Sequence, residues 1–246
     1  MKIGVITDVH NNAVALNAIL QKFQAENCGG IICCGDMLGI GPYPEETISI
    51  LSDIPDLMAC VRGNHEKYLI EGMPEEVPND ENMSLNEMEH HKWEHNLLSE
   101  NSKKFIAGLK YEELLIINKK RIYVSHYPID KNSNYIKSPK NPALDDLHKM
   151  FEYADADVIL YGHNHKKSVL RGDKYYINCG SLGCPAKDKN TARAGILSVD
   201  INDDISFDEI TLEYDVTKVL DDINRLNYPD NEIIKTIFYG VKEMIQ

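Results

Sequence analysis

The sequence predicts an α/β fold in which two β-sheets pack face to face and helices cover their outer faces. The first 65 residues alternate between short apolar runs and segments of helical character, in the order strand, helix, strand, helix, strand. The second half of the chain holds several short apolar runs with short connections, which indicates a second sheet. Of the 246 residues 43% are hydrophobic, so we expect one domain over residues 1–246 with a sizeable core.

The N-terminal strands are the most regular part of this pattern. Apolar runs predict strands at Lys2–Thr7, Ile31–Cys34 and Leu57–Val61. Apolar residues recur at helical density between residues 12 and 26, where Asn11 or Asn12 can cap the first turn. A loop rich in Gly and Pro at residues 39–44 precedes a second predicted helix over 45–51.

The middle of the chain interrupts the alternation. Residues 72–83 are irregular, residues 84–108 have helical character, and the whole stretch 66–110 can form an insertion over a site. Two apolar runs at 114–118 and 121–125 with two lysines between them predict a hairpin, although the preferred turn residues are absent.

The last hundred residues predict a helix, a group of strands and a helical end. The helix is expected over 142–153, with Pro142 near its first turn. Strands are expected at Val158–Tyr161, Ser168–Leu170, Tyr175–Asn178, Gly195–Val199 and Ile205–Glu213. Residues 215–246 predict two C-terminal helices with a break near Pro229.

Composition narrows the class of protein. Acidic residues outnumber basic ones by 39 to 26, the net charge is −13, and no basic stripe for duplex nucleic acid is visible. No apolar run reaches the roughly 18 residues of a membrane span, and no secretory leader precedes the first strand. The six cysteines lack the spacing of a disulfide scaffold, which favours reduced thiols. We therefore expect a cytoplasmic protein without a membrane partner.

Residues that can bind metal follow the predicted strands. In chain order they are Asp8 and His10, Asp36, Asn64 and His65, His126, and His163 and His165. The ends of adjacent parallel strands lie at one edge of a sheet, so ligands far apart in sequence can meet there. A lone Asp-x-His pair is well explained by a surface turn; the joint occurrence of these phrases is what indicates a metal site.

The spacing and chemistry of these residues suit a hydrolytic centre. Asp8 and His10 are two residues apart, as are His163 and His165, so each pair faces one cavity if strand geometry continues through it. Nitrogen and oxygen ligands suit Mn, Fe, Zn, Co or Ni. A carboxylate such as Asp36, after the flexible Gly35, can bridge two metals that activate a hydroxide.

These phrases, in this order, resemble the calcineurin-like metallophosphoesterase superfamily. The motifs are Asp8-Val9-His10, Gly35-Asp36, Gly63-Asn64-His65, a later lone His126, and Gly162-His163-Asn164-His165. The resemblance covers roughly residues 1–185, and the stretch 35–44 resembles a small bacterial and archaeal phosphodiesterase branch. It implies a four-layer α/β/β/α sandwich with two divalent or transition metal ions, Mn or Fe being favoured.

The resemblance also implies a role for each motif residue. One metal would be held by Asp8, His10, Asp36 and His165, and the other by Asp36, Asn64, His126 and His163. His65 would assist the leaving oxygen, and Arg62 would hold phosphate oxygens bidentately. The implied reaction is hydrolysis of a phosphate diester in a small phosphorylated substrate, which can be nucleotide-like. Three positions depart from the branch, since Asn11 and Tyr127 stand where Gly is usual and Cys179 where Pro is usual.

Other functions stay open on the sequence alone. Within the enzymes, a phosphatase acting on phosphoproteins or on dinucleoside polyphosphates is the alternative, although Asp-Arg-Gly is missing after Asp36. A non-catalytic scaffold of the same fold, like a retromer subunit, is the alternative from another class. A nuclease is a third, against which the acidic balance speaks.

A second group of histidines invites a metal interpretation. His90, His91 and His95 lie at near-helical spacing around Trp93. We interpret them as part of a polar helix with Trp93 packed inward, because we find no frame of carboxylates and histidines around them.

Overall fold

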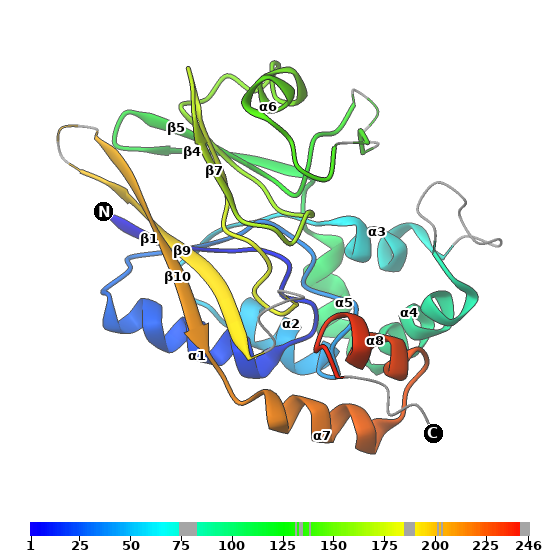
Figure 1. The fold of residues 1–246 in the computed structure, drawn as a ribbon. Coiled ribbons are helices and arrows are strands. Elements are labelled where there is room, and N and C mark those ends of the chain that lie inside the picture. The colour runs from blue at the N-terminus through cyan, green and yellow to red at the C-terminus, as the bar shows by residue number, and fades with distance from the viewer. Residues whose placement is uncertain are drawn as a thin grey trace.

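Two five-stranded β-sheets form the centre of the molecule (Figure 1). The computed structural model describes residues 1–73, 83–130, 132, 135–137, 139–184, 190–200, 202 and 204–241. The first sheet has the strand order β10-β9-β1-β2-β3 and the second β4-β5-β6-β8-β7. Each combines parallel and antiparallel pairs, so the prediction of two mixed sheets is confirmed.

The strands follow the apolar runs of the sequence. In the first sheet they are β1 (Lys2–Ile6), β2 (Ile31–Cys33), β3 (Leu57–Cys60), β9 (Thr191–Val199) and β10 (Ile205–Glu213). In the second they are β4 (Glu112–Ile117), β5 (Lys120–Ser125), β6 (Val158–Leu160), β7 (Ser168–Arg171) and β8 (Tyr175–Asn178). The predicted hairpin is confirmed as β4 and β5, but its turn is Asn118 and Lys119. Asn118 has φ 54°, a conformation that asparagine tolerates in such turns.

Helices occupy the connections and the C-terminal end. They are α1 (Ala13–Ala25), α2 (Pro44–Ser52), α3 (Asn64–Glu71), α4 (Leu85–Leu97), α5 (Glu100–Ala107), α6 (Leu144–Met150), α7 (Val216–Leu226) and α8 (Asn231–Ile237). Helix α3 was not predicted, and the predicted stretch 84–108 is two helices, because Ser99 caps a new one at the nitrogen of Ser102. Residues 74–82, which belong to the predicted insertion, lie outside the described residues. The same holds for residues 242–246, the last part of the predicted C-terminal helices.

The elements form four layers. Helices α1, α2 and α5 pack on one face of the first sheet through side chains such as Leu16 and Ile106. The opposite face meets the second sheet in a core that includes Val5 and Leu160. Helix α6 covers the outer face of the second sheet through Leu147 and through Phe151, the residue that follows the helix. The order helix, sheet, sheet, helix confirms the predicted fold class.

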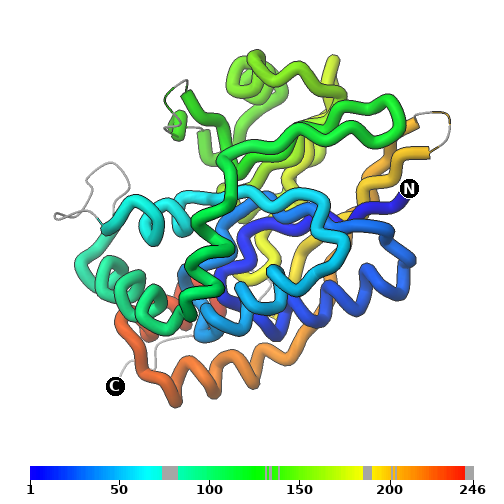
Figure 2. Tube along the Cα trace, turned by 180° about the vertical axis from the view of Figure 1, so that it is seen from behind, coloured from blue at the N-terminus to red at the C-terminus, as the bar shows by residue number. Residues whose placement is uncertain are grey.

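One end of the molecule is closed by helices from two distant parts of the chain. Seen from behind, α4 lies beside the C-terminal helices α7 and α8 (Figure 2). Trp93 of α4 stacks on Tyr228, with ring centroids 4.4 Å apart, so the inward packing predicted for Trp93 is confirmed. All six cysteines are free thiols. Among the described residues, no helix combines the length and the apolar character needed to cross a bilayer.

Candidate metal centre

The motif residues lie in sharp turns just after their strands. Strand β1 ends at Ile6, and the backbone has φ 52° at Asp8 and φ 48° at His10. Positive φ values recur at Asp36, His163 and His165. Strand geometry therefore does not continue through the paired residues. The side chains are brought together by residues in the left-handed backbone conformation, which is unusual for residues other than glycine. Asn11 has φ 52°, as expected of a residue that replaces glycine here.

Asp8, His10 and His165 form the first group of possible ligands. The two Nε2 atoms of His10 and His165 are 2.8 Å apart. Oδ1 of Asp8 lies 3.4 Å from Nε2 of His165 and 3.8 Å from Nε2 of His10. Asp8 and His10 are fully buried, so one carboxylate and two imidazoles converge on a single shielded point.

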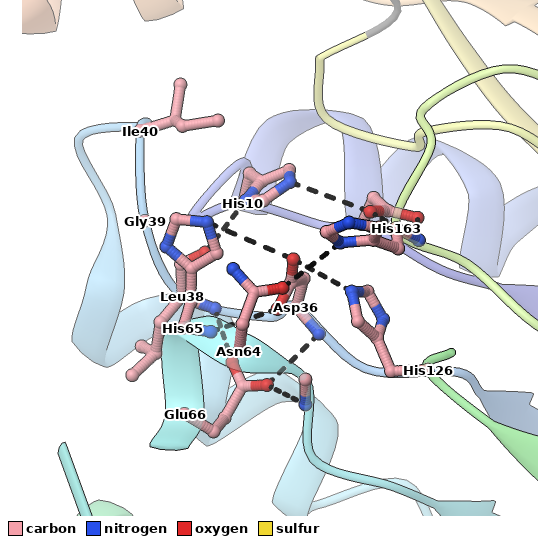
Figure 3. A network of polar contacts seen from close by, with 12 residues as sticks. His10, Asp36, Leu38, Gly39, Ile40, Asn64, His65, Glu66, His126 and His163 are labelled. Atoms are coloured by element: carbon pink, nitrogen blue, oxygen red, sulfur yellow. Dashed lines mark hydrogen bonds and ion pairs between the residues drawn. The ribbon is translucent and has the colours of Figure 1, made fainter. Parts of the chain in front are cut away.

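Asp36, His126, His163 and Asn64 form the second group (Figure 3). Oδ2 of Asp36 is 3.0 Å from Nε2 of His126. Oδ1 of Asn64 is 3.2 Å from Nδ1 of His163. Ligand atoms of Asp36, His10 and His65 also lie within 4.8 Å of one another. Asp36 therefore stands between the two groups, the position that the resemblance implies for a bridging carboxylate.

Backbone carbonyls orient two of the imidazoles. Nδ1 of His10 donates to the carbonyl of Leu38 at 2.9 Å, and Nδ1 of His126 donates to that of Cys34 at 2.8 Å. With Nδ1 used in this way, Nε2 of each neutral ring has its lone pair directed into the centre. Such outer hydrogen bonds commonly fix the tautomer of metal-binding histidines.

The protonation of the centre also fits a cation. Burial, with His165 nearby, lowers the pKa of His10 to about 4, and burial with His126 nearby lowers the pKa of His163 to about 4. Burial acts in the same direction on His126, but the carboxylate of Asp36 outweighs it and raises the pKa of His126 to about 9. Without metal, a proton therefore sits between His126 and Asp36, where a metal ion would replace it.

Glu66 holds the turn that carries Asp36. Its fully buried carboxylate accepts four backbone N–H groups, from Asp36 at 3.0 Å, Met37 at 2.8 Å, Leu38 at 2.9 Å and Gly63 at 2.7 Å. A Cβ on Gly63 would stand 2.0 Å from Oδ1 of Asp36, so glycine is required for this approach. Sequence reasoning missed Glu66, although its place three residues after Gly63 is that of a helix-capping residue.

Helix α4 holds the same loop from the other side. Glu94 is fully buried and accepts the side-chain amide of Asn11 at 2.6 Å and the backbone N–H of Gly39 at 2.7 Å. His91 donates from Nδ1 to Glu94 at 2.6 Å, and Nε2 of His90 accepts the backbone N–H of Ile40 at 3.0 Å. The interpretation of these histidines as lacking a carboxylate frame is wrong for His91, because Glu94 pairs with it inside the molecule.

His65 and Arg62 take up different positions relative to the centre. Nε2 of His65 lies 3.9 Å from Oδ2 of Asp36, and its backbone N–H donates to Oδ1 of the same residue at 3.1 Å. The guanidinium of Arg62 instead lies 4.3 Å above the ring of Tyr111, and its Nε donates to the carbonyl of Leu109 at 2.9 Å. In this arrangement Arg62 is engaged away from the ligand groups, and its phosphate contact stays a prediction.

Two hollows meet at His65 and Glu87, which line both. The larger, about 400 Å³, is the aromatic hollow, lined by Tyr68, Tyr127, Tyr135, Lys137, Lys140 and His163 among others. Tyr127 stacks on Tyr135, with ring centroids 3.6 Å apart, and lies 4.0 Å from the ring of His163. The smaller, about 230 Å³, is the apolar hollow, lined by Ile40, Ile233, Ile237, Phe238, His91 and His165 among others.

The donor set fits two metal ions. Each group presents a carboxylate with two imidazoles, and the second adds an amide oxygen, so hard and borderline cations are favoured over soft ones. Asp8, His10, Asp36 and His126 are buried, while His163 lines the aromatic hollow and His165 the apolar hollow, so a substrate can reach the ligand groups from both.

The comparisons agree with the fold and the motifs. The family model of the calcineurin-like phosphoesterase superfamily domain matches residues 1–204, and the chain belongs to this superfamily. Among curated proteins, an uncharacterized protein of Methanocaldococcus jannaschii is 27% identical over 250 residues, covering 93% of this chain and 94% of its own.

Solved structures show the same fold at low identity. A hypothetical protein from Pyrococcus horikoshii has a TM-score of 0.79 at 18% identity, with 98% of this chain and 99% of the other covered. A metallophosphoesterase from Sphaerobacter thermophilus has a TM-score of 0.71 at 20% identity, with the same coverage. Membership of the superfamily supports a hydrolase of phosphate esters whose activity uses divalent metals.

Proposed function

We propose that the protein is a phosphodiesterase that depends on two metal ions and acts on a small phosphorylated substrate. The observation that supports this most directly is the position of Asp36 between two groups of buried ligands. Asp8, His10, Asp36 and His165 would hold one ion, and Asp36, Asn64, His126 and His163 the other. When bound, such a pair supplies Lewis acidity and lowers the pKa of water.

The groups around the centre orient its ligands and can contact a bound phosphate ester. The carbonyls of Leu38 and Cys34 hold two imidazole rings in place, so little reorientation is needed when a ligand arrives. His65 lines both hollows and can reach an ester oxygen in either. Burial lowers the pKa of His65 well below its usual value, so the ring is neutral and would donate an N–H to the departing oxygen.

The two hollows favour a diester over a monoester. A monoester has one organic arm, whereas a diester has two that leave phosphorus in different directions. The aromatic and apolar hollows meet at His65, beside the ligand groups, and give each arm a place of its own. The stacked pair Tyr127 and Tyr135 suits an aryl or nucleobase arm.

The first test measures metal content and turnover together. Elemental analysis of the purified protein should find two transition metals per chain, and bis(p-nitrophenyl) phosphate should be hydrolysed faster than p-nitrophenyl phosphate, with loss of turnover on chelation. Asp36→Asn should lose metal and turnover together, because both groups lose their shared carboxylate. Asp53→Asn, an exposed position at the end of α2, is the matched control.

The role of His65 is tested separately. His65→Ala should keep both metals and lower kcat by roughly 10²–10⁴-fold, the range for loss of a group that assists proton transfer. Full turnover in this variant would contradict the role. Absence of bound metal and of turnover with every added cation would contradict the enzyme and favour a scaffold of the same fold.

A further inference from the structure

One wall of the apolar hollow is formed by apolar side chains, two of which are unusually exposed to solvent. Ile233 and Ile237 lie one turn apart on α8, and their exposed fractions, 47% and 53%, are high for isoleucine. Together with Ile40 and Phe238 they give the hollow an apolar wall beside His165. A volume of about 230 Å³ is below the roughly 300–1,000 Å³ of a site for a whole drug-sized ligand, so it suits one arm of a substrate.

Two carboxylates line the same hollow. Glu87 of α4 and Asp230, the residue before α8, are both half-buried there. Burial raises the pKa of Asp230, and burial raises the pKa of Glu87 against the opposing charge of His91, with a smaller raising contribution from Asp230. No lysine or arginine of the described residues lines the apolar hollow, whereas the aromatic hollow has Lys137 and Lys140. The two hollows therefore differ in the charge that they would attract.

Polar atoms in the hollow lack partners. Asp230 occupies the capping position of α8, yet its side chain does not cap the helix, and its Oδ1 is buried without a hydrogen-bond partner among the described residues. Nε2 of His91, a residue only 1% exposed, is likewise buried without a partner in the described part of the chain. Buried polar atoms without partners are uncommon and costly, so a ligand that supplies donors would be favoured.

We propose that the apolar hollow binds an aliphatic ester arm that ends in an ammonium group, so that the preferred substrate is a phosphodiester with one aromatic arm and one aminoalkyl arm. This rests on the proposed function. The methylene groups of the arm would contact Ile40, Ile237 and Phe238. The ammonium would lie between Glu87 and Asp230, in a hollow that no lysine or arginine of the described residues lines. The aromatic arm would lie in the aromatic hollow against Tyr135, whose ring stacks on Tyr127.

The test compares p-nitrophenyl phosphodiesters that share the aryl arm and differ in the second arm. With n-butyl, 4-aminobutyl and 3-carboxypropyl arms, kcat/KM should be highest for the aminobutyl ester, about five-fold above the butyl ester, as expected of one half-buried ion pair. The carboxypropyl ester should be the slowest. Equal values for the three esters would overturn the proposal.

Two variants locate the effect. In Glu87→Gln/Asp230→Asn the ratio between the aminobutyl and butyl esters should fall to about one, while Glu89→Gln, exposed on the same helix, should leave the ratio unchanged. Ile237→Ser should raise KM for the butyl ester relative to the methyl ester. A ratio that survives the double substitution would overturn the proposal.

A binding measurement separates this inference from the proposed function. If no diester is hydrolysed, the proposed function fails, and the hollow is then tested by saturation-transfer NMR of n-butylammonium chloride on the metal-free protein. Binding that exceeds that of 1-butanol and is lost in the double variant would support the ammonium site. Equal signals for the two probes would overturn it.

Discussion

Two buried glutamates hold the loop after Asp36, and they do so in different ways. Each oxygen of Glu66 accepts two backbone N–H groups, all from the turns that carry the motifs. Glu94 accepts hydrogen bonds from one backbone N–H, from the side-chain amide of Asn11 and from Nδ1 of His91. Glu66 is thus bound to groups that can only donate, whereas Glu94 faces one partner, His91, that can change its tautomer.

The loop after Asp36 thus has two supports, the motif support of Glu66 on α3 and the α4 support of Glu94. Helix α3 begins within the motif itself, so Glu66 and Asp36 are fixed by the same local structure. Helix α4 reaches the loop from a distant part of the chain, with residues 74–82 between it and the motif. The motif support is expected to be rigid, and the α4 support to be more tolerant of substitution.

Acid should destabilise the ligand groups and the α4 support at once and have the largest effect. Burial is the leading cause that lowers the pKa of His10, His163, His90 and His95 to about 4, against about 6.5 in an unfolded chain. Folded pKa values below the unfolded ones mean that the stabilisation is present above pH 6.5 and is lost as the pH falls toward 4. The free energy of unfolding of the metal-free protein should fall by roughly 4 kcal/mol or more over this range.

Urea unfolding at a series of pH values measures this fall. His90 must stay unprotonated at Nε2 to accept the N–H of Ile40, so His90→Gln should make the pH dependence shallower by removing the contribution of His90. A free energy of unfolding that is constant between pH 6.5 and 4 would contradict the prediction.

Glu66→Gln should have the next largest effect. Whichever way the amide is turned, its NH₂ group faces two backbone N–H groups that have no other acceptor in the described structure. We expect a loss of about 3 kcal/mol in the free energy of unfolding, the scale for buried donors left unsatisfied. Metal affinity should fall as well, because the turn of Asp36 is no longer fixed. Glu46→Gln, exposed on α2, is the control in both urea unfolding and metal titration.

The sequence predicted the strands and the ligand groups because both depend on local patterns. Apolar runs placed the strands to within a few residues, and the polar phrases after them marked the edge where Asp36, His126 and His163 meet. The left-handed turns were not predicted, because no glycine marks Asp8, His10 or His165. At Asn11, by contrast, the residue type did indicate a positive φ.

The contribution of α4 could not be predicted for a different reason. A helix that packs on a core usually shows an apolar stripe, and this stripe is how it is recognised in a sequence. The inward face of α4 instead carries His90, His91 and Glu94, which are polar. Their partners are Asn11, Gly39 and Ile40, and no local rule joins residues 50 or more positions apart. Such a helix has the appearance of a solvent-exposed one until the loop that it contacts is known.

Glu94→Gln should have the smallest effect, although Glu94 is as buried as Glu66. The amide oxygen can still accept Asn11 and Gly39, and the NH₂ group can donate to Nδ1 of His91 if the imidazole proton moves to Nε2, which has no partner among the described residues. We expect the free energy of unfolding to fall by about 1 kcal/mol, because one charge-assisted hydrogen bond is replaced by a neutral one. The control Glu89→Gln should show no change. Urea unfolding of the three proteins measures this. A loss as large as that of Glu66→Gln would show that His91 cannot change its tautomer, and α4 would then be as rigid a support of the centre as the helix that begins in the motif.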